Sequence, residues 1–218
     1  MTQIQKTDLL HNQVYHIIKE QIMDGDILPG ERIIETRVAE QLGVSRGTIR
    51  EAFQMLLKDG LLIRNDKIIS IYNPDKKEIS DVYECRISIE SLAAKLATQR
   101  ISSNEIIQLE KVISDSKQAL KDNNKKSLTI LNQAFHDIIH AASNNEQLIK
   151  ICDTIKTKIL FIRTRILKEH LSNFSDFVDD HEKIFIAIKN QDANLAEKEM
   201  RIHIESSFKT ILDAIESK

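Results

Sequence analysis

Three histidines and one asparagine in the second half of the chain are spaced so that their side chains could meet. Asn132 and His136 are four residues apart, which places them on one face of a helix. His181 lies about ten residues before Gln191-Asp192, where a turn is expected, and His203 lies about eleven residues after it. At 1.5 Å per residue both are roughly 16 Å from that turn, so the two imidazoles lie level in an antiparallel pair. Three imidazoles and one amide oxygen would suit a divalent transition metal such as Zn, Ni, Mn or Fe.

Ordinary structural roles compete with this interpretation. Any one histidine could be a core or surface residue, because histidine is intermediate in burial. His140, one turn beyond His136, is either a spare ligand or a residue that is exposed or supports the ligands from behind. Arg86 lies near the inward face of residues 83–97, where an unpaired charge is costly, so a salt bridge to Glu90 at i+4 is the plain alternative there. The apolar residues expected on that face are Ile87, Leu92, Ala93 and Leu96.

Long helices must position these residues. The 218 residues include no Trp, two Pro and five Gly, and 41% of them are hydrophobic. Few helix breakers and many Ile, Leu, Lys and Glu favour a mainly helical protein. The hydrophobic pattern predicts helices at about 76–99, 103–121, 126–142, 146–168, 176–190 and 193–216, with Ser103, Asp176 and Asp192 as N-caps. Antiparallel helices of these lengths form a bundle of six, or of seven.

The segment before this bundle has a different pattern. Residues 35–62 predict two short helices joined by a tight turn. Gly43 suits the left-handed residue that ends the first helix, and Ser45 can cap the second. Arg46 and Arg50 then lie in the first turns of the second helix, where a recognition helix meets base edges. On periodicity alone, an ordinary helical hairpin explains the pattern equally well.

Shorter elements flank these two helices. They are a helix at about 8–23 capped by Thr7, a short strand at 32–34, and two strands at 61–64 and 68–72 that form a wing. Asn73-Pro74-Asp75 interrupts the pattern, so we expect one domain at 1–73 and another at 74–218.

The residues of the first domain resemble the winged-helix DNA-binding domain of the GntR family of bacterial transcription regulators. The similar stretches are GDILPGERI at 25–33, VAEQLGVSRGTIREAF at 38–53 and LLKDGLL at 56–62. The resemblance implies DNA contacts by Ser45, Arg46, Gly47, Thr48 and Arg50, with Arg37 and Lys67 beside them. Two positions depart from the family. Thr36 replaces a frequent arginine, for which Arg37 can substitute, and the wing tip, Asn65-Asp66-Lys67, carries an acidic residue that would repel phosphate.

The second domain resembles the FCD (FadR C-terminal) class of this family, in its six-helix form. That class has a metal site built from an Asp four residues before the His of a Phe-His pair, followed by two further histidines about 22 residues apart. Phe135-His136, His181 and His203 match this pattern, whereas Asn132 stands where the class has Asp. A neutral amide is a weaker ligand and leaves the site one charge unit more positive. The resemblance also implies that Arg86 binds the carboxylate of an effector.

Charge and cysteine usage limit the classes of function. The formal net charge is −2, and residues 1–73 hold 9 Lys and Arg against 10 Asp and Glu. DNA affinity must therefore come from the placement of a few basic residues and from dimerisation. No run approaches the roughly 20 apolar residues that span a bilayer, and the first residues lack a signal-peptide pattern. Cys85 and Cys152 do not suggest a disulfide framework, so we expect a cytoplasmic protein without a membrane partner.

Together these observations predict a homodimeric transcription regulator, a repressor by our reading, and not an enzyme. Its winged helices would bind a double-stranded DNA operator, and its bundle would hold a divalent metal with a small organic carboxylate that modulates DNA binding. One alternative is a metal sensor in which the ion itself is the effector. A second alternative is a metal-dependent hydrolase, against which the sequence shows no general base beside the histidines.

Overall fold

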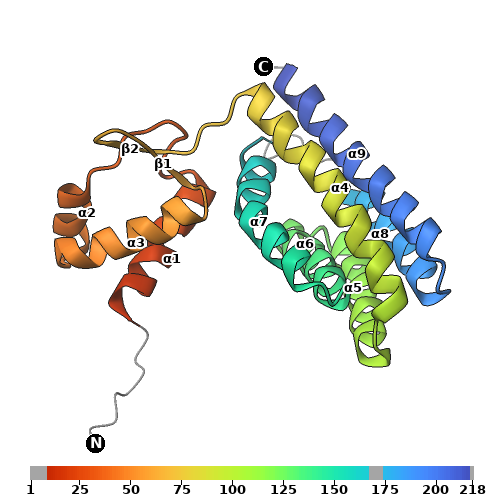
Figure 1. The fold of residues 1–218 in the computed structure, drawn as a ribbon. Helices are drawn as coiled ribbons and strands as arrows, with labels where there is room; N and C mark the ends of the chain where they lie inside the picture. Colours follow the sequence, from red (N-terminus) through yellow and green to blue (C-terminus); the bar gives the residue numbers. More distant parts are fainter. Residues whose placement is uncertain (1–8, 167–173, 217–218) are drawn as a thin grey trace, which may run out of the picture. The chain divides into compact units, whose positions relative to one another are not determined.

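The computed structural model describes residues 9–166 and 174–216 (Figure 1). The backbone divides into two compact units. One holds the residues up to Asp75 together with Ile155–Arg165, and the other holds Lys76–Thr154 together with the residues from Ile166 onward. The predicted domain boundary after residue 73 stays a proposal, and the first helix of the second unit begins at Lys76.

The first unit is a helix-turn-helix with a two-stranded wing. Its elements are α1 (Leu10–Asp24), α2 (Glu35–Leu42), α3 (Arg46–Lys58), β1 (Leu62–Asn65) and β2 (Ile68–Ile71). Gly43 ends α2 with a φ of 64°, and the Ser45 side chain accepts a hydrogen bond from the Thr48 N–H, as the sequence predicts. The strands are antiparallel with Leu62 opposite Ile71, and Asp66 at the tip has a φ of 55°. The winged helix-turn-helix is therefore confirmed.

Two predicted details of this unit are wrong. The first helix begins at Leu10, with Leu9 at its N-cap and no side-chain cap, whereas the predicted cap Thr7 lies outside the described residues. The strand expected at 32–34 is only an isolated bridge between Arg32 and Ser70. The backbone there bonds to β2 at a few points, for example from the Ile33 N–H to the Ile69 carbonyl at 3.0 Å.

The second unit contains the helical bundle. Its helices are α4 (Lys76–Arg100), α5 (Ser103–Lys121), α6 (Lys125–Ala142), the first part of α7 (Glu146–Ile166), α8 (Phe174–Lys189) and α9 (Ala193–Glu216). Helix α4 packs against α9 and α6, α5 packs against α6 and α8, and α8 packs against α9. Figure 1 shows α4 and α9 running side by side along their length. The predicted class, mainly helical with a helical bundle, is confirmed.

Polar residues with positive φ occur at three of the described turns of this bundle, whose sequence has no glycine. Asn123, Asn144 and Gln191 adopt positive φ values of 50°, 46° and 58°. Asn tolerates this left-handed conformation better than most residues, because its short side chain can bond to the local backbone. Asp192 caps α9 by accepting a hydrogen bond from the Leu195 N–H at 2.9 Å, as predicted.

Two of the predicted caps are wrong. Ser102, not Ser103, caps α5, because Ser102 forms a reciprocal capping box with Glu105 three residues later. Helix α8 already begins at Phe174, so Asp176 lies in its first turn, where a negative charge still favours the helix dipole.

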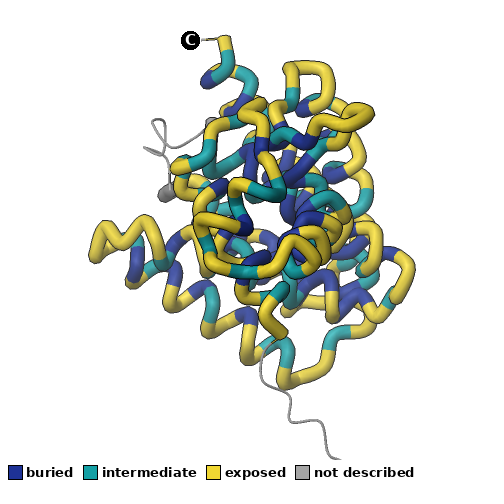
Figure 2. The backbone as a smooth tube through the Cα atoms, turned by 90° about the vertical axis from the view of Figure 1, so that its left-hand side faces the viewer, coloured by how far each residue is buried: buried dark blue, intermediate teal, exposed yellow. Residues whose placement is uncertain are grey.

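Buried and exposed residues alternate along the helices (Figure 2). On α4 the buried stripe includes Tyr83, Arg86, Glu90 and Ala93, so a buried ion pair replaces part of the expected apolar face. Leu92, predicted to face inward, is 42% exposed. No helix within the described ranges is both long enough and apolar enough to cross a membrane.

Candidate functional sites

Three helices of the bundle bring the predicted metal ligands together. His136 on α6, His181 on α8 and His203 on α9 are buried, and each offers one ligand atom within 4.8 Å of the other two. The Nε2 atoms of His181 and His203 are 3.2 Å apart. Asn132 lies one turn before His136, is also buried, and its Oδ1 has no hydrogen-bond partner among the described residues. The four predicted ligands thus lie together in the bundle core.

Aromatic packing holds the rings in place. The Phe135 ring stacks on the His181 imidazole with centroids 3.9 Å apart and an interplanar angle of 11°. Phe177 packs edge-on against His181 at 5.4 Å. Because Phe135 precedes His136 on α6, the Phe-His pair orients one histidine from its own helix and a second from α8. Apolar rings around the site also exclude water and lower the local dielectric.

A carboxylate that the sequence analysis did not include lies beside this set. Glu90 on α4 is buried, and its Oε2 contacts His136 Nδ1 and lies 3.4 Å from His140 Nε2. The expectation that no general base lies beside the histidines is therefore wrong. The i+4 spacing revealed the pairing of Glu90 with Arg86, but nothing in the sequence fixes how α4 is rotated against α6. His140 is buried rather than exposed.

Arg86 faces the bundle core, as expected, and its salt bridge is formed. Its Nε donates to Glu90 Oε1 at 2.6 Å, and the two side chains are 3% and 4% exposed. Its Nη1 is buried without a hydrogen-bond partner in the described part of the chain. The guanidinium also lies 5.6 Å from the centre of the Tyr83 ring. One end of Arg86 is therefore fixed, and one donor is left for a further acceptor.

This environment shifts the pKa values of two histidines on α6 in opposite directions. Burial lowers the pKa of His136 to about 3, although Glu90 opposes that change. Burial also opposes the charged form of His140, but hydrogen bonds to Cys152 and Glu90 outweigh it and raise its pKa to about 10. Burial would raise the pKa of Glu90, but Arg86 and His136 hold it well below its usual range. Near neutral pH His136 is therefore uncharged and Glu90 is ionised.

A second carboxylate lies against the ring of His203. Asp180 Oδ2 is 3.5 Å from His203 Nδ1, and its Oδ1 accepts a hydrogen bond from Lys183 at 2.9 Å. The hydrogen bond with His203 lowers the pKa of Asp180, with a smaller contribution from Lys183. Asp180 lies on α8 one residue before His181, so the same helix turn carries a candidate ligand and an acidic neighbour.

The donor set fits a divalent cation. Neutral imidazole nitrogens and an amide oxygen are ligands that Zn²⁺, Ni²⁺, Mn²⁺ and Fe²⁺ accept. Buried polar atoms normally have hydrogen-bond partners, and those without one call for an explanation. His136 Nε2 and Asn132 Oδ1 are two such atoms among the described residues. An ion bound by both would explain why they are buried together.

Most of the predicted DNA-contacting residues are exposed in the first unit. Ser45, Arg46, Gly47 and Arg50 are exposed at the start of α3, Thr48 is half-buried, and Arg37 and Lys67 are exposed on α2 and the wing. The Ser45 and Thr48 hydroxyl oxygens lie 2.9 Å apart, so the helix cap also fixes the Thr48 side chain. These positions match the geometry of a recognition helix, while the contacts themselves stay predictions.

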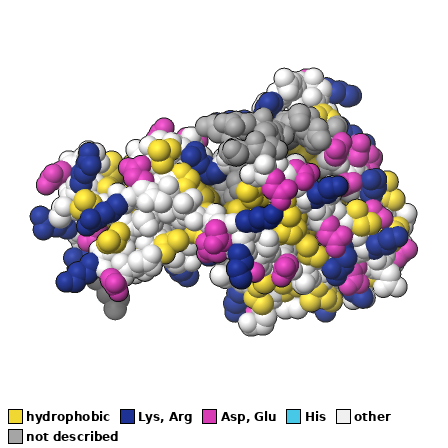
Figure 3. Space-filling model, turned by 90° about the horizontal axis from the view of Figure 1, so that it is seen from above, with side chains coloured by type: hydrophobic (Ala, Val, Ile, Leu, Met, Phe, Trp, Pro, Cys, Tyr) yellow, Lys and Arg dark blue, Asp and Glu magenta, His cyan; other side chains and the backbone are white. Residues whose placement is uncertain are grey.

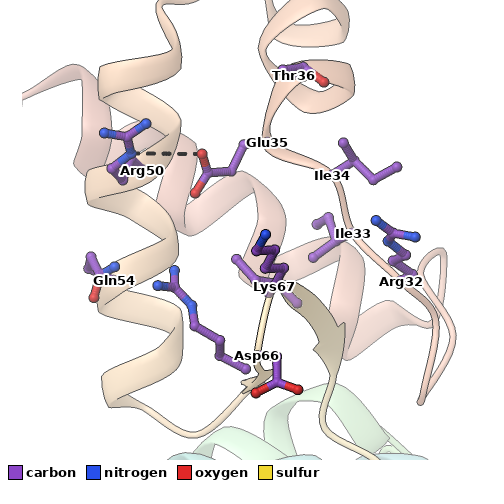
Figure 4. Close-up of a pocket in the computed structure, with 11 residues that line it drawn as sticks. Arg32, Ile33, Ile34, Glu35, Thr36, Arg50, Gln54, Asp66 and Lys67 are labelled. Atoms are coloured by element: carbon purple, nitrogen blue, oxygen red, sulfur yellow. Dashed lines mark ion pairs between the residues drawn. The ribbon is translucent and has the colours of Figure 1, made fainter.

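A basic cleft of about 500 Å³ lies between α3 and the wing. Figure 4 shows that Lys67 and Asp66 border it from the wing and Arg50 and Gln54 from α3. Glu35, at the start of α2, points at Arg50, with Oε2 at 3.8 Å from the Arg50 Nε. Glu35 and Arg50 are fifteen residues apart on different helices, so local spacing does not indicate this pair.

Charges of both signs alternate over the face seen in Figure 3, with Lys and Arg beside Asp and Glu. This agrees with the net charge of −2. A small negative net charge gives little nonspecific attraction to DNA, so any affinity would depend on where the basic residues are placed.

Comparisons with known proteins all indicate one family of bacterial transcription regulators. Residues 10–68 match the family described as bacterial regulatory proteins of the gntR family, and residues 81–206 match the FCD domain. The HTH-type transcriptional regulator YdhC of Bacillus subtilis is 30% identical over 207 residues, which cover 94% of this chain and 92% of that protein. The HTH-type transcriptional repressor RspR of Escherichia coli is 23% identical over 211 residues, which cover 96% and 92%. The solved structure of Escherichia coli McbR/YncC superposes with a TM-score of 0.78 at 20% identity, over 95% of this chain and 99% of the other.

Proposed function

The chain belongs to the gntR family of bacterial regulatory proteins and carries an FCD domain, and from this premise we propose that it is an operator-binding repressor controlled by a metal-dependent effector site. A DNA-binding regulator, rather than an enzyme, is what the family supports. The repressor assignment draws on the relative RspR, which is described as a repressor. The observation that carries the effector site is the buried set of His136, His181, His203 and Asn132.

DNA binding is assigned to the start of α3 and to the cleft beside it. Arg46 and Arg50 can each bond a guanine edge with two hydrogen bonds or hold a phosphate. The same end of α3 is proposed to contact the DNA backbone through Ser45, Gly47 and Thr48. Helix N-termini favour phosphate because their first N–H groups have no partner within the helix. Arg37 on α2 and Lys67 on the wing, both exposed, are proposed as further contacts.

A homodimer would place two such surfaces on a pseudo-palindromic operator. The first 73 residues are slightly acidic overall, so a single winged helix has little electrostatic affinity for DNA. Two linked half-site contacts compensate through effective concentration. Sedimentation should therefore give a particle of about twice 25.1 kDa, and a monomer at micromolar concentration that still binds the operator tightly would contradict the dimer.

The effector is proposed to be a small organic carboxylate bound next to the ion. With neutral histidines and a neutral Asn132, the ligands leave the full charge of a divalent ion in place, which attracts an anion. The free Nη1 of Arg86 offers a second positive donor for the same carboxylate. When bound, the ion would supply the Lewis-acid contact, whereas Arg86 would orient the carboxylate.

One observation favours a second candidate, a regulator for which the metal ion alone is the effector. Arg86 is already held by Glu90 at 2.6 Å, so only part of its guanidinium is available to an organic anion. A hydrolase is less well supported: Glu90 lies beside His136, but Arg86 and two histidines already engage its carboxylate. The relatives are also named as regulators.

The test combines metal analysis with DNA binding. Untagged protein should contain about one divalent ion per chain, and EDTA should lower its melting temperature, because an ion that binds only the folded bundle stabilises it. Mono-, di- and tricarboxylates should raise the melting temperature only in the metal-loaded protein and should change its affinity for DNA from its own promoter region. A change caused by metal alone would favour the ion sensor. The proposed effector site would be contradicted if the protein contains no metal and if His136→Gln and His181→Gln have the same melting temperature as wild type with added Zn²⁺.

A further inference from the structure

At the proposed metal centre, His136 and His203 each have a carboxylate next to the ring nitrogen Nδ1. His203 directs its Nε2 towards His181, at 3.2 Å, and its Nδ1 towards Asp180, at 3.5 Å. His136 directs its Nδ1 towards Glu90, which leaves its buried Nε2 without a partner among the described side chains. Glu90 comes from α4 and Asp180 from α8, so two independent helices produce the same arrangement.

A carboxylate behind the ring decides which nitrogen can bind a metal. Neutral imidazole has one N–H and one lone pair, and an ionised carboxylate can only accept a hydrogen bond. The proton therefore lies on Nδ1, next to the carboxylate, and the lone pair lies on Nε2. Such partners fix the tautomer and ring orientation of metal-binding histidines and make the ligand nitrogen more basic.

We propose that Glu90 and Asp180 are positioning residues that hold His136 and His203 with Nε2 directed at a shared ion. This inference rests on the metal centre proposed above. Neither carboxylate is a ligand here, because each lies on the Nδ1 side of its ring. Their charges act through the imidazoles instead.

A different use of Glu90 has to be weighed. Glu90, His136 and His140 also lie close enough to hold an ion of their own. The guanidinium of Arg86, 2.6 Å from the same carboxylate, opposes a second cation there. Such an ion would also need the Nδ1 lone pair of His136, whereas the contact with Glu90 places a proton on that atom. The geometry therefore favours one ion, on the Nε2 side of His136.

The two carboxylates differ in how they can be tested. Glu90 is almost fully buried, so its substitution leaves Arg86 as an unpaired buried charge that endangers folding. Asp180 lies at the rim of the core, with 19% of its side chain exposed, so Asp180→Asn should fold. Asp179 is its exposed neighbour on α8, and Asp179→Asn removes the same charge one residue away. For Glu90 we pair Glu90→Gln with Arg86→Met, so that no buried charge is left, and use exposed Glu84→Gln as its control.

The first measurement is Zn²⁺ affinity of the full chain in competition with a chromophoric chelator. Loss of such a partner typically weakens metal binding about 10- to 100-fold, and we expect this for Asp180→Asn and for the Glu90→Gln/Arg86→Met pair. Asp179→Asn and Glu84→Gln should bind Zn²⁺ as wild type does. Equal losses in Asp180→Asn and Asp179→Asn would mean a general charge effect and would overturn the positioning role.

The second measurement needs no metal. Long-range ¹H–¹⁵N NMR of metal-stripped protein distinguishes the two imidazole tautomers, with His136→Gln and His203→Gln used for assignment. We expect the Nδ1–H form at both positions, and a loss of that preference at His203 in Asp180→Asn. An Nε2–H form in wild type overturns the proposal. If wild type has the expected tautomers but takes up no Zn²⁺, the metal centre itself fails while the positioning of the rings stands.

Discussion

The two units contain ion pairs of the same chemical type in opposite environments. Arg50 and Glu35 in the first unit are 3.8 Å apart, with side chains 67% and 25% exposed. Arg86 and Glu90 in the bundle are 2.6 Å apart, with side chains 3% and 4% exposed. Exposed pairs contribute about 0.2–1 kcal/mol, because water screens the attraction and both side chains lose freedom. A buried pair contributes little net stability, but loss of one partner costs about 3–5 kcal/mol.

This difference separates two kinds of binding surface. If Arg50 contacts DNA as proposed, it must exchange partners, and it can leave Glu35 at little cost. A buried constellation must keep its geometry in the absence of a ligand, and Arg86 cannot leave Glu90 without exposing an unpaired charge to the core. The exposed pair, which is easily separated, therefore suits a surface that rearranges. The buried pair, which is costly to break, suits a preorganised site.

The largest expected effect comes from removal of one partner of the buried pair. Arg86→Met should lower the free energy of unfolding by about 3–5 kcal/mol, because Glu90 is left ionised in the core. The combined Arg86→Met and Glu90→Gln variant should recover most of this loss, since no charge remains unpaired. Urea titration followed by circular dichroism measures both. Arg50→Met is the matched control and should change stability by less than about 1 kcal/mol. Equal losses in Arg86→Met and Arg50→Met would remove the contrast between the units.

The second prediction concerns pH and the metal-stripped protein. The folded-state pKa of His136, about 3, lies below its ordinary value of 6.5, so the unfolded chain binds the extra proton and stability falls as pH drops from about 6.5. The folded-state pKa of His140, about 10, lies above 6.5, so its contribution is complete below about pH 6.5 and is lost as pH rises towards 10. Stability should therefore have a maximum near pH 6.5, with slopes approaching about 1.4 kcal/mol per pH unit on each side.

Variants of the two histidines assign the two sides of that maximum. His136→Gln should flatten the decline between pH 6.5 and 5, where the carboxylates are still ionised in the unfolded chain. His140→Gln should flatten the decline above pH 6.5. Melting temperatures across this range, with EDTA present, give the profile. A profile that rises steadily from pH 5 to 9 would show that His140 is not held in its charged form.

Local signals in the sequence predicted most of the fold. Gly43 and Ser45 specify the turn between α2 and α3 through backbone conformation and capping, which depend on only a few neighbouring residues. The cap of α5 was misplaced by one residue, although Glu105 three residues after Ser102 carried the signal for a capping box. Short-range rules therefore gave the elements and most of their ends.

Longer-range features could be predicted only in part. The match of Phe135-His136, His181 and His203 to a known spacing predicted a set that does converge. The contact between Glu90 and His136 was missed, since it depends on how α4 rotates and packs against α6. Likewise Leu92 was expected in the core, but Arg86 and Glu90 occupy the buried stripe and turn Leu92 outward. Helix periodicity identifies a face, and tertiary packing decides which residues of it are buried.

The third prediction tests the exposed surface directly. Arg46→Ala and Arg50→Ala should each weaken operator binding by about 1–3 kcal/mol if each arginine makes a bidentate base contact. Loss of a phosphate contact would instead weaken binding to all DNA sequences alike and would reduce the salt dependence of binding by about one counterion. Fluorescence anisotropy at several salt concentrations separates these cases. Lys111→Ala on α5 removes an exposed positive charge from the bundle and should leave DNA binding unchanged. Unchanged binding in both arginine variants, with folding intact, would refute the assignment.

The smallest effect is expected from Glu35→Gln, which breaks the exposed pair from its acidic side. Stability should change by less than about 1 kcal/mol, because the pair is long and largely hydrated. Operator affinity should rise by a factor of about two to five, since Arg50 no longer has to leave a carboxylate before it reaches DNA. Glu40→Gln removes an exposed acidic charge from the same helix and is the matched control. In an Arg50→Ala background Glu35→Gln should give no gain, because the two substitutions act on one contact and are therefore not additive. If the gain persists without Arg50, Glu35 repels phosphate on its own and does not control Arg50.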